Sequence, residues 1–153
     1  MTNRCSEADG EYATRRGANN APSSCIESYT ITQPLPPREL SKNGRPNPWD
    51  RADLYRATRE SARLAWLQAT AYQRPLWDGT CFVWVNWYYR GSAPDTDNAI
   101  ARCSAIFDAL QDAGIIINDR QIERHVVDQR RVHTYPHEDP RVEVKVWRKV
   151  HEG

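Results

Sequence analysis

The segment at residues 95–123, DTDNAIARCSAIFDALQDAGIIINDRQIE, constrains the fold of this chain more than any other. Gly114 is a natural helix stop, because glycine readily takes the left-handed conformation that ends a helix. Asp97 or Asn98 can cap the start of the helix, where a side-chain oxygen accepts from free backbone N–H groups. Between these limits, apolar residues recur at the spacing of one helix face, and they are Ile100, Cys103, Ile106, Phe107, Leu110 and Ala113. The sequence therefore predicts one helix between the acidic start and Gly114.

The same helix has a polar side. At about 100° per residue, four side chains fall away from the apolar stripe, and they are Asp97, Ser104, Asp108 and Asp112. We expect the helix to bury its apolar face and to turn a mostly acidic face outward.

Three aspartates in this segment form a candidate metal site. If Asp95 and Asp97 lie on extended backbone, their i, i+2 spacing points both carboxylates the same way. Two carboxylates about 4 Å apart repel by roughly 4 kcal/mol at an effective dielectric near 20, so such a pair shares a proton or holds a cation. Asp119, after the apolar run at residues 115–117, can supply a third oxygen ligand to a hard ion such as Mg²⁺. The alternative is that the pair only caps a helix and the acids are solvated.

Local patterns elsewhere predict the remaining elements. We expect a long helix at residues 49–72 and strands at residues 26–32, 81–89, 122–132 and 141–147. The run CFVWVNWYY at residues 81–89 is apolar on both faces apart from Asn86, which predicts a central strand. The last two strands are predicted to pair as a hairpin. This order predicts an α/β fold: a single small domain with a mixed β-sheet flanked by two helices.

Composition limits the class of protein. Residues 1–24 are polar and lack apolar periodicity, which predicts a flexible tail before a folded domain at residues 25–153. A formal net charge of only +1 excludes a strongly basic DNA-coating protein, so phosphate contacts must come from local patches. The four cysteines form no CxxC pair, which disfavours a zinc ribbon, and Cys81 and Cys103 are expected to be buried thiols. No signal-peptide core or membrane-length apolar run is present, and a cytoplasmic location is expected.

Two surface patterns leave alternatives open. The helix at residues 49–72 carries arginines on neighbouring turns, at Arg51, Arg56, Arg59 and Arg63. Such a row can track DNA phosphates, or it can be a solvated face paired with Asp53 and Glu60. The aromatic residues at 81–89 can stack on unpaired bases or pack in the core or a dimer. The chain has no P-loop, GxGxxG or GxSxG motif, which argues against nucleotide-driven, dinucleotide or serine-hydrolase chemistry.

The order of DxDN, a helix ending FDALQDAG, an apolar run and ND resembles the RusA family of Holliday-junction resolvases, also called crossover junction endodeoxyribonucleases. The segment LPPRELSKNGR at residues 35–45 is similar to the N-terminal part of that family, and the resemblance extends from about residue 31 to residue 147. It implies a small homodimeric endonuclease that resolves four-way DNA junctions with Mg²⁺, for which Mn²⁺ can substitute. It also implies that Asp95, Asp97 and Asp119 are both metal ligands and catalytic residues.

The loop at residues 41–48 is placed near the active site by the same resemblance, while an ordinary surface turn is the alternative. The candidate DNA-contacting residues of the chain are Asn43, Arg45, Arg90, Asn98 and Arg120.

One residue departs from the family pattern. Ser104 stands where the family usually has a lysine, four residues before Asp108, and serine is short and neutral. The nearest cation, Arg102, lies about 140° around the expected helix from Asp97, so it is predicted to point elsewhere. The alternative function is therefore a junction-binding homologue with weak or no cleavage.

Overall fold

A computed structural model of the chain describes residues 24–42, 44, 47–132 and 137–151. The tail predicted at residues 1–24 lies outside the described residues, apart from Ser24, which begins the first strand. The domain combines helices with one sheet of parallel and antiparallel strands, which confirms the predicted α/β class and mixed sheet. The elements are β1 (Ser24–Gln33), η1 (Arg38–Leu40), α2 (Pro48–Ala69), β2 (Cys81–Tyr89), α3 (Thr96–Arg102), α4 (Ser104–Asp112), η2 (Asp119–Gln121), β3 (Ile122–Arg131) and β4 (Arg141–His151).

The four strands form one sheet in the order β1-β4-β2-β3. β4 is antiparallel to both β1 and β2, whereas β3 is parallel to β2. β2 therefore lies inside the sheet, as its apolar sequence predicts. The predicted hairpin of the last two strands is wrong, because β2 lies between β3 and β4. β3 occupies the edge of the sheet, where its charged residues, such as Glu123 and Arg124, remain exposed.

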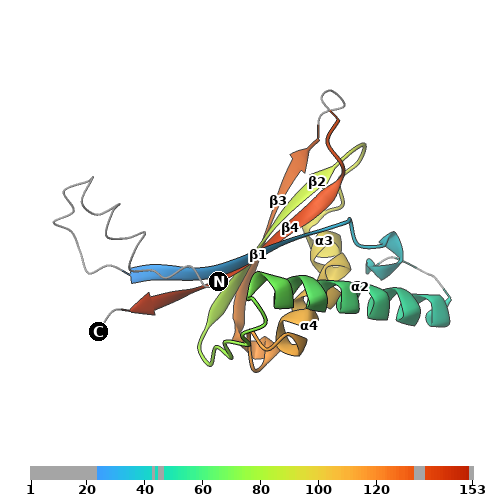
Figure 1. The fold of residues 1–153 in the computed structure, drawn as a ribbon. Coiled ribbons are helices and arrows are strands. Elements are labelled where there is room, and N and C mark those ends of the chain that lie inside the picture. Colours follow the sequence, from blue (N-terminus) through green and yellow to red (C-terminus); the bar gives the residue numbers. More distant parts are fainter. Residues whose placement is uncertain (1–23, 43, 45–46, 133–136, 152–153) are drawn as a thin grey trace, which may run out of the picture.

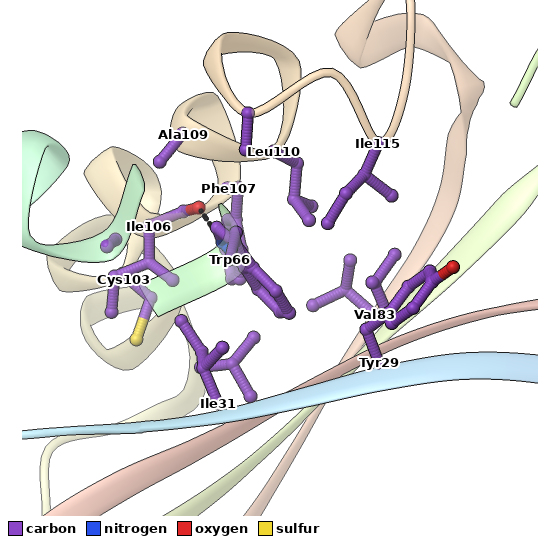
Figure 2. Packing of buried hydrophobic residues seen from close by; sticks show 14 of the residues in the cluster. Tyr29, Ile31, Trp66, Val83, Cys103, Ile106, Phe107, Ala109, Leu110 and Ile115 are labelled. Carbon is purple, nitrogen blue, oxygen red and sulfur yellow. Dashed lines mark hydrogen bonds between the residues drawn. The ribbon is translucent and has the colours of Figure 1, made fainter. Parts of the chain in front are cut away.

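The core lies between the sheet and the helices, which gather on one side of it (Figure 1). Alternate β2 residues are buried against the helices, whereas Trp84 on the other face is 39% exposed. Figure 2 shows Trp66 of α2 at the centre of the apolar cluster, among side chains of α4 and the sheet. Cys81 and Cys103 are buried free thiols, as predicted. No helix in the described part of the chain is long and apolar enough to cross a membrane.

The single helix predicted before Gly114 is in fact two helices, α3 and α4, separated at Cys103. The Cys103 N–H is shared between the carbonyls of Ala99 and Ile100, at 3.1 Å each, a pattern common at helix ends. The apolar spacing continues across this break, which is why periodicity alone does not reveal it. The N-cap is Asp95, not Asp97 or Asn98.

The predicted stop at Gly114 is confirmed, since its φ is +74°. Its N–H donates to the Gln111 carbonyl at 3.1 Å, and the Ile115 N–H donates to the Leu110 carbonyl at 3.0 Å. This pair of bonds is the Schellman pattern that ends many helices. The chain then turns into the buried run that leads to η2 and β3.

Candidate active site

The acidic pair lies just after the carboxyl end of the central strand β2. Asp95 is extended, with φ −67° and ψ 166°, and its Oδ1 accepts the Asn98 N–H at 2.8 Å. Asp97 lies in the first turn of α3, and both side chains are exposed. The structure therefore bears out the capping alternative for Asp95, whereas the metal-ligand reading of the pair stays a prediction.

Asp119 begins the short helix η2, and its local backbone is firmly held. Asn118 caps this turn, and Gln121 completes a capping box. The Gln121 Oε1 accepts the N–H groups of Ile117 and Asn118 at 2.8 Å each, while its Nε2 donates to the Gly79 carbonyl at 2.9 Å. The Asp119 side chain is exposed at the surface of this turn.

The acidic pair and Asp119 lie at opposite ends of the parallel strands β2 and β3. Cys81 of β2 pairs with Ile122 of β3, and Tyr89 pairs with Arg131. Asp119 precedes the start of β3, whereas the pair follows the end of β2, where the Gln129 side chain donates to the Pro94 carbonyl. Seven residues separate Ile122 from Gln129, so at about 3.3 Å per residue the two acidic sites are roughly 20 Å apart.

One chain therefore does not bring the three predicted ligands to one point. Among the described residues, no group of three or more His, Cys, Asp or Glu side chains lies close enough to hold a metal ion. From the sequence, the two ends of the segment at residues 95–119 were expected to lie close together and to share one metal site. The helices between them instead span the length of the sheet and keep the ends apart. The donor chemistry still suits a hard cation, but each end of one chain supplies only part of a ligand set.

Asp119 has Asp108 of α4 as its acidic neighbour. Burial raises the pKa of Asp108, and the negative charges of Asp119 and Asp112 raise it further. The Tyr55 hydroxyl of α2 donates to the Asp108 carboxylate. The prediction that α4 turns an acidic face outward is therefore wrong for these residues, since Asp108 and Asp112 face α2 instead.

The row of arginines on α2 pairs mainly with acids of the same protein. Arg56 pairs with Asp53 and Arg63 pairs with Glu60, as in the solvated alternative. The Arg59 Nη2 donates to Asp112 Oδ1 of α4 at 2.8 Å. Arg51 has a different role, since its guanidinium donates to carbonyl groups at the end of η1, among them that of Leu40 at 3.3 Å.

The candidate DNA-contacting residues differ in their surroundings. Asn43 and Arg45 lie outside the described residues. The Asn98 side-chain oxygen accepts the Lys42 N–H at 3.1 Å, so this residue joins the loop after η1 to α3. The Arg90 Nη2 donates to the Glu138 carbonyl at 2.7 Å, and the Arg120 side chain is exposed beside Asp119.

Of two basic residues beside the acidic pair, Arg38 was not named by sequence reasoning and Arg102 was predicted to point elsewhere. Arg38 and Arg102 line one cavity together with Arg90, at the end of the sheet where Asp95 lies. Arg102 is buried, as its place on the inner side of α3 requires, and its Nε donates to the Pro36 carbonyl at 3.0 Å. Arg102 is the one basic residue between positions 96 and 112. A single cation in a stretch of otherwise apolar, acidic and neutral polar residues was the sequence signal that could have pointed to a special role.

Comparison with known proteins places the chain in a family. No curated protein matches it. Among solved structures, PurLQS from Thermotoga maritima is 15% identical over 84% of this chain and 18% of that chain, with a TM-score of 0.37. A HypE–HypF complex is 13% identical over 95% of this chain and 43% of that chain, with a TM-score of 0.34. The chain spans less than half of either, and TM-scores this low carry no argument. The family model described as endodeoxyribonuclease RusA matches residues 36–147, most of the chain, which therefore belongs to the RusA family of endodeoxyribonucleases.

Proposed function

We propose that this protein is a divalent-metal-dependent endodeoxyribonuclease that cuts branched DNA, and four-way junctions in particular. Membership of the RusA family supports the nuclease activity and the class of substrate. Asp95, Asp97 and Asp119 are its candidate metal ligands and catalytic residues. The observation that carries the finer proposal is the separation of Asp119 from the acidic pair along β2 and β3.

The separation favours an active site shared between two copies of the chain. In a two-fold dimer both copies use the same surface patch, within which a residue of one copy meets a different residue of the other, and the reverse contact forms by symmetry. An acidic pair from one copy and Asp119 from its partner then make two equivalent sites. Two sites related by a two-fold axis suit a four-way junction, in which two strands are cut. The proposed homodimer is therefore part of the active site.

The three carboxylates fit Mg²⁺, with Mn²⁺ as a substitute, because hard divalent ions prefer oxygen ligands and complete their shells with water and phosphate oxygens. When bound, such an ion supplies a Lewis acid that lowers the pKa of a water molecule and offsets charge on the scissile phosphate. The protein supplies the fixed geometry. Asp95 is held by the Asn98 N–H, and the turn that carries Asp119 is held by Gln121.

A complementation experiment tests the shared site. Asp97→Asn and Asp119→Asn are each expected to abolish cutting of a synthetic four-way junction in Mg²⁺. When the two variants are unfolded together and refolded as a mixture, the heterodimer contains one intact site and one doubly defective site. Mixing should therefore restore nicking of one strand, without the paired cuts of the natural protein. The junction carries a different fluorophore on each strand, so that single and paired nicks are distinguished.

The outcomes separate the parts of the proposal. A mixture that stays inactive, while the natural protein cuts, would show that each site lies within one chain. Cutting that survives Asp97→Asn would remove the acidic pair from the mechanism. A natural protein that cuts no branched DNA with either Mg²⁺ or Mn²⁺ would end the nuclease proposal.

A second candidate function is junction binding with little or no cleavage. It is favoured by Ser104, which begins α4 directly after the break and brings no charge to the position of the family lysine. Ser104→Lys tests it. Tight junction binding by the natural chain, with cutting only after the lysine is introduced, supports the second candidate. Efficient cutting by the natural chain excludes it.

A further inference from the structure

A cavity of about 420 Å³ lies beside the acidic pair, between η1, the loop after β2, and α3. Three arginines line it: Arg38 of η1, Arg90 of the loop, and Arg102 of α3. Residues 91–94, Ser41 and Asn98 complete the wall. We call this cavity the arginine pocket. Its lining combines guanidinium groups with small polar groups, which suits a phosphate oxygen better than an apolar ligand.

The positive charge of the arginine pocket is not offset from within. None of the ion pairs between described residues involves Arg38, Arg90 or Arg102. Arg38 and Arg102 are close enough to disfavour each other, since burial first and then the charge of Arg38 lower the pKa of Arg102. Holding like charges together costs free energy unless an anion lies between them. The charge of Glu39, which does not line the pocket, acts on the pKa of Arg102 in the opposite direction and is the smallest of these influences, so the lining itself keeps an excess of positive charge.

Two of the three arginines, Arg90 and Arg102, are also held in place before any ligand arrives, and the backbone that carries Arg38 is braced. The Arg102 guanidinium donates to the Pro36 carbonyl and lies over the Trp87 ring, 4.7 Å from its centroid. The Arg90 Nη2 is fixed on the Glu138 carbonyl at 2.7 Å. Arg51 holds the end of η1 from α2, through the Ser41 carbonyl at 3.3 Å. Such support keeps a binding group in position, so little side-chain entropy remains to be lost on binding.

The arginine pocket adjoins the acidic pair directly. Pro94, which lines it, precedes Asp95 in the chain, and the N–H of Asn98, another lining residue, donates to Asp95 Oδ1 at 2.8 Å. Two exposed carboxylates repel a DNA strand, so a cutting site of this kind needs positive charge close by. Arg102 is the one basic residue of α3 and α4. Besides the proposed metal ion, the arginine pocket therefore supplies the basic side chains that lie next to the pair in this chain.

We propose that the arginine pocket binds one backbone phosphate of the DNA strand that is cut, a neighbour of the phosphate presented to the acidic pair. This inference rests on the proposed function. Arg38 and Arg90 are the exposed members, and because the Arg90 guanidinium is already held by the Glu138 carbonyl, Arg38 makes the direct contact, whereas Arg102 forms the charged floor. Bound in this way, the strand is fixed in register, because phosphate contacts set position and carry no sequence information.

The experiment pairs a change in the protein with a change in the DNA. Arg38→Ala removes the guanidinium proposed to make the direct contact, and Arg63→Ala is the matched control on α2. Junction binding is measured by fluorescence anisotropy in Ca²⁺, so that cleavage does not interfere, over a series of NaCl concentrations. We expect Arg38→Ala to weaken binding about tenfold and to lower the slope of log K against log salt by about 1. The control should stay within about twofold of the natural protein.

A set of junctions, each with one neutral methylphosphonate, then locates the phosphate. One position next to the cut should weaken binding of the natural protein, yet add nothing further in Arg38→Ala, because the same contact is already lost. If the losses in binding from the methylphosphonate and from Arg38→Ala add at every position, while the natural protein still cuts, the proposed phosphate contact is wrong and the nuclease proposal is unaffected. If one methylphosphonate position has no further effect in Arg38→Ala, but the natural protein never cuts, the phosphate contact is supported and the nuclease proposal is wrong.

A third arm separates DNA from a free anion. Inorganic phosphate is titrated into the natural protein and Arg38→Ala by calorimetry. Arg38-dependent phosphate binding without any coupled DNA position would mean that the pocket serves a small anion, and the inference would be wrong. Arg102→Lys serves as a second variant, because it keeps the buried charge but loses the fork of donors. It should weaken junction binding less than Arg38→Ala, and an equal or larger loss would contradict the roles assigned here.

Discussion

The indole Nε1 of Trp66 donates a hydrogen bond of 3.1 Å to the Ile106 carbonyl oxygen, and both residues are fully buried (Figure 2). This bond joins α2 to α4 through the middle of the core. It satisfies the polar group of a large aromatic side chain, which would otherwise be costly to bury.

Trp66→Phe is expected to lower the free energy of unfolding by about 2–3 kcal/mol, from the lost hydrogen bond and the cavity left by the smaller ring. Urea unfolding measures the change. Trp49→Phe is the matched control, since Trp49 is 79% exposed and its replacement should cost less than about 0.5 kcal/mol. Equal effects of the two substitutions would mean that the position of Trp66 does not decide its contribution.

Gly114→Ala is expected to destabilise the protein by about 1–2 kcal/mol, because the φ of +74° is unfavourable for a residue with a Cβ. The new methyl would also lie 2.9 Å from the Arg74 guanidinium, which can move, and 3.0 Å from the Arg74 Cβ, which moves only with the backbone. Gly79→Ala is the control: nothing lies within 4 Å of a Cβ there. Thermal unfolding of both variants checks the prediction, and a Gly114→Ala protein as stable as Gly79→Ala would contradict it.

His125 should make stability depend on pH. Burial lowers the pKa of His125 from its ordinary value of 6.5, and the ring packs 4.7 Å from that of Phe107. Below pH 6.5 the unfolded chain takes up a proton that the folded protein does not. The contribution of neutral His125 to the free energy of unfolding is therefore fully present above pH 6.5. It decreases as the pH falls, by at most about 1.4 kcal/mol per pH unit. His125→Gln should flatten this part of the profile in urea titrations at pH 7.5 and 5.5. An unchanged slope would assign it to other groups.

Arg59 and Asp112 should be coupled at neutral pH. The hydrogen bond from Arg59 holds the pKa of Asp112 below its ordinary value of 3.8. The pair is partly exposed, at 39% and 28%, so solvent screening limits the coupling to about 0.5–1 kcal/mol. A double-mutant cycle with Arg59→Gln and Asp112→Asn measures it at pH 7. The coupling is expected above pH 3.8 and is lost as the pH falls through the lower, folded-state pKa. The more exposed pair Arg63–Glu60 is the comparison, and it should show weaker coupling.

The local elements could be predicted from the sequence because their signals are local. The run CFVWVNWYY has the apolar and β-branched character of an interior strand, and β2 covers those same residues. Gly114 ends α4 because a left-handed residue is needed there, and glycine takes that conformation at little cost. Family membership could also be inferred, since the motif carries its residue types in a fixed order.

The relations between elements came only from the tertiary structure. Periodicity tells which face of a strand is buried, but not which strand lies beside it, so the placement of β2 between β3 and β4 could not be seen. The one-residue break at Cys103 leaves the apolar stripe intact, and burial of Arg102 depends on the distant carbonyl of Pro36.

The candidate site shows most clearly what the sequence determined and what the tertiary structure decided. The sequence determined that Asp95, Asp97 and Asp119 are present and that each lies at the end of a regular element. The parallel pairing of β2 and β3 then decided that Asp119 and the acidic pair lie at opposite ends of the sheet. Parallel pairing requires the connecting helices to carry the chain back along the full length of the strands. Residues close together in sequence motifs are for that reason held far apart in one copy of the fold.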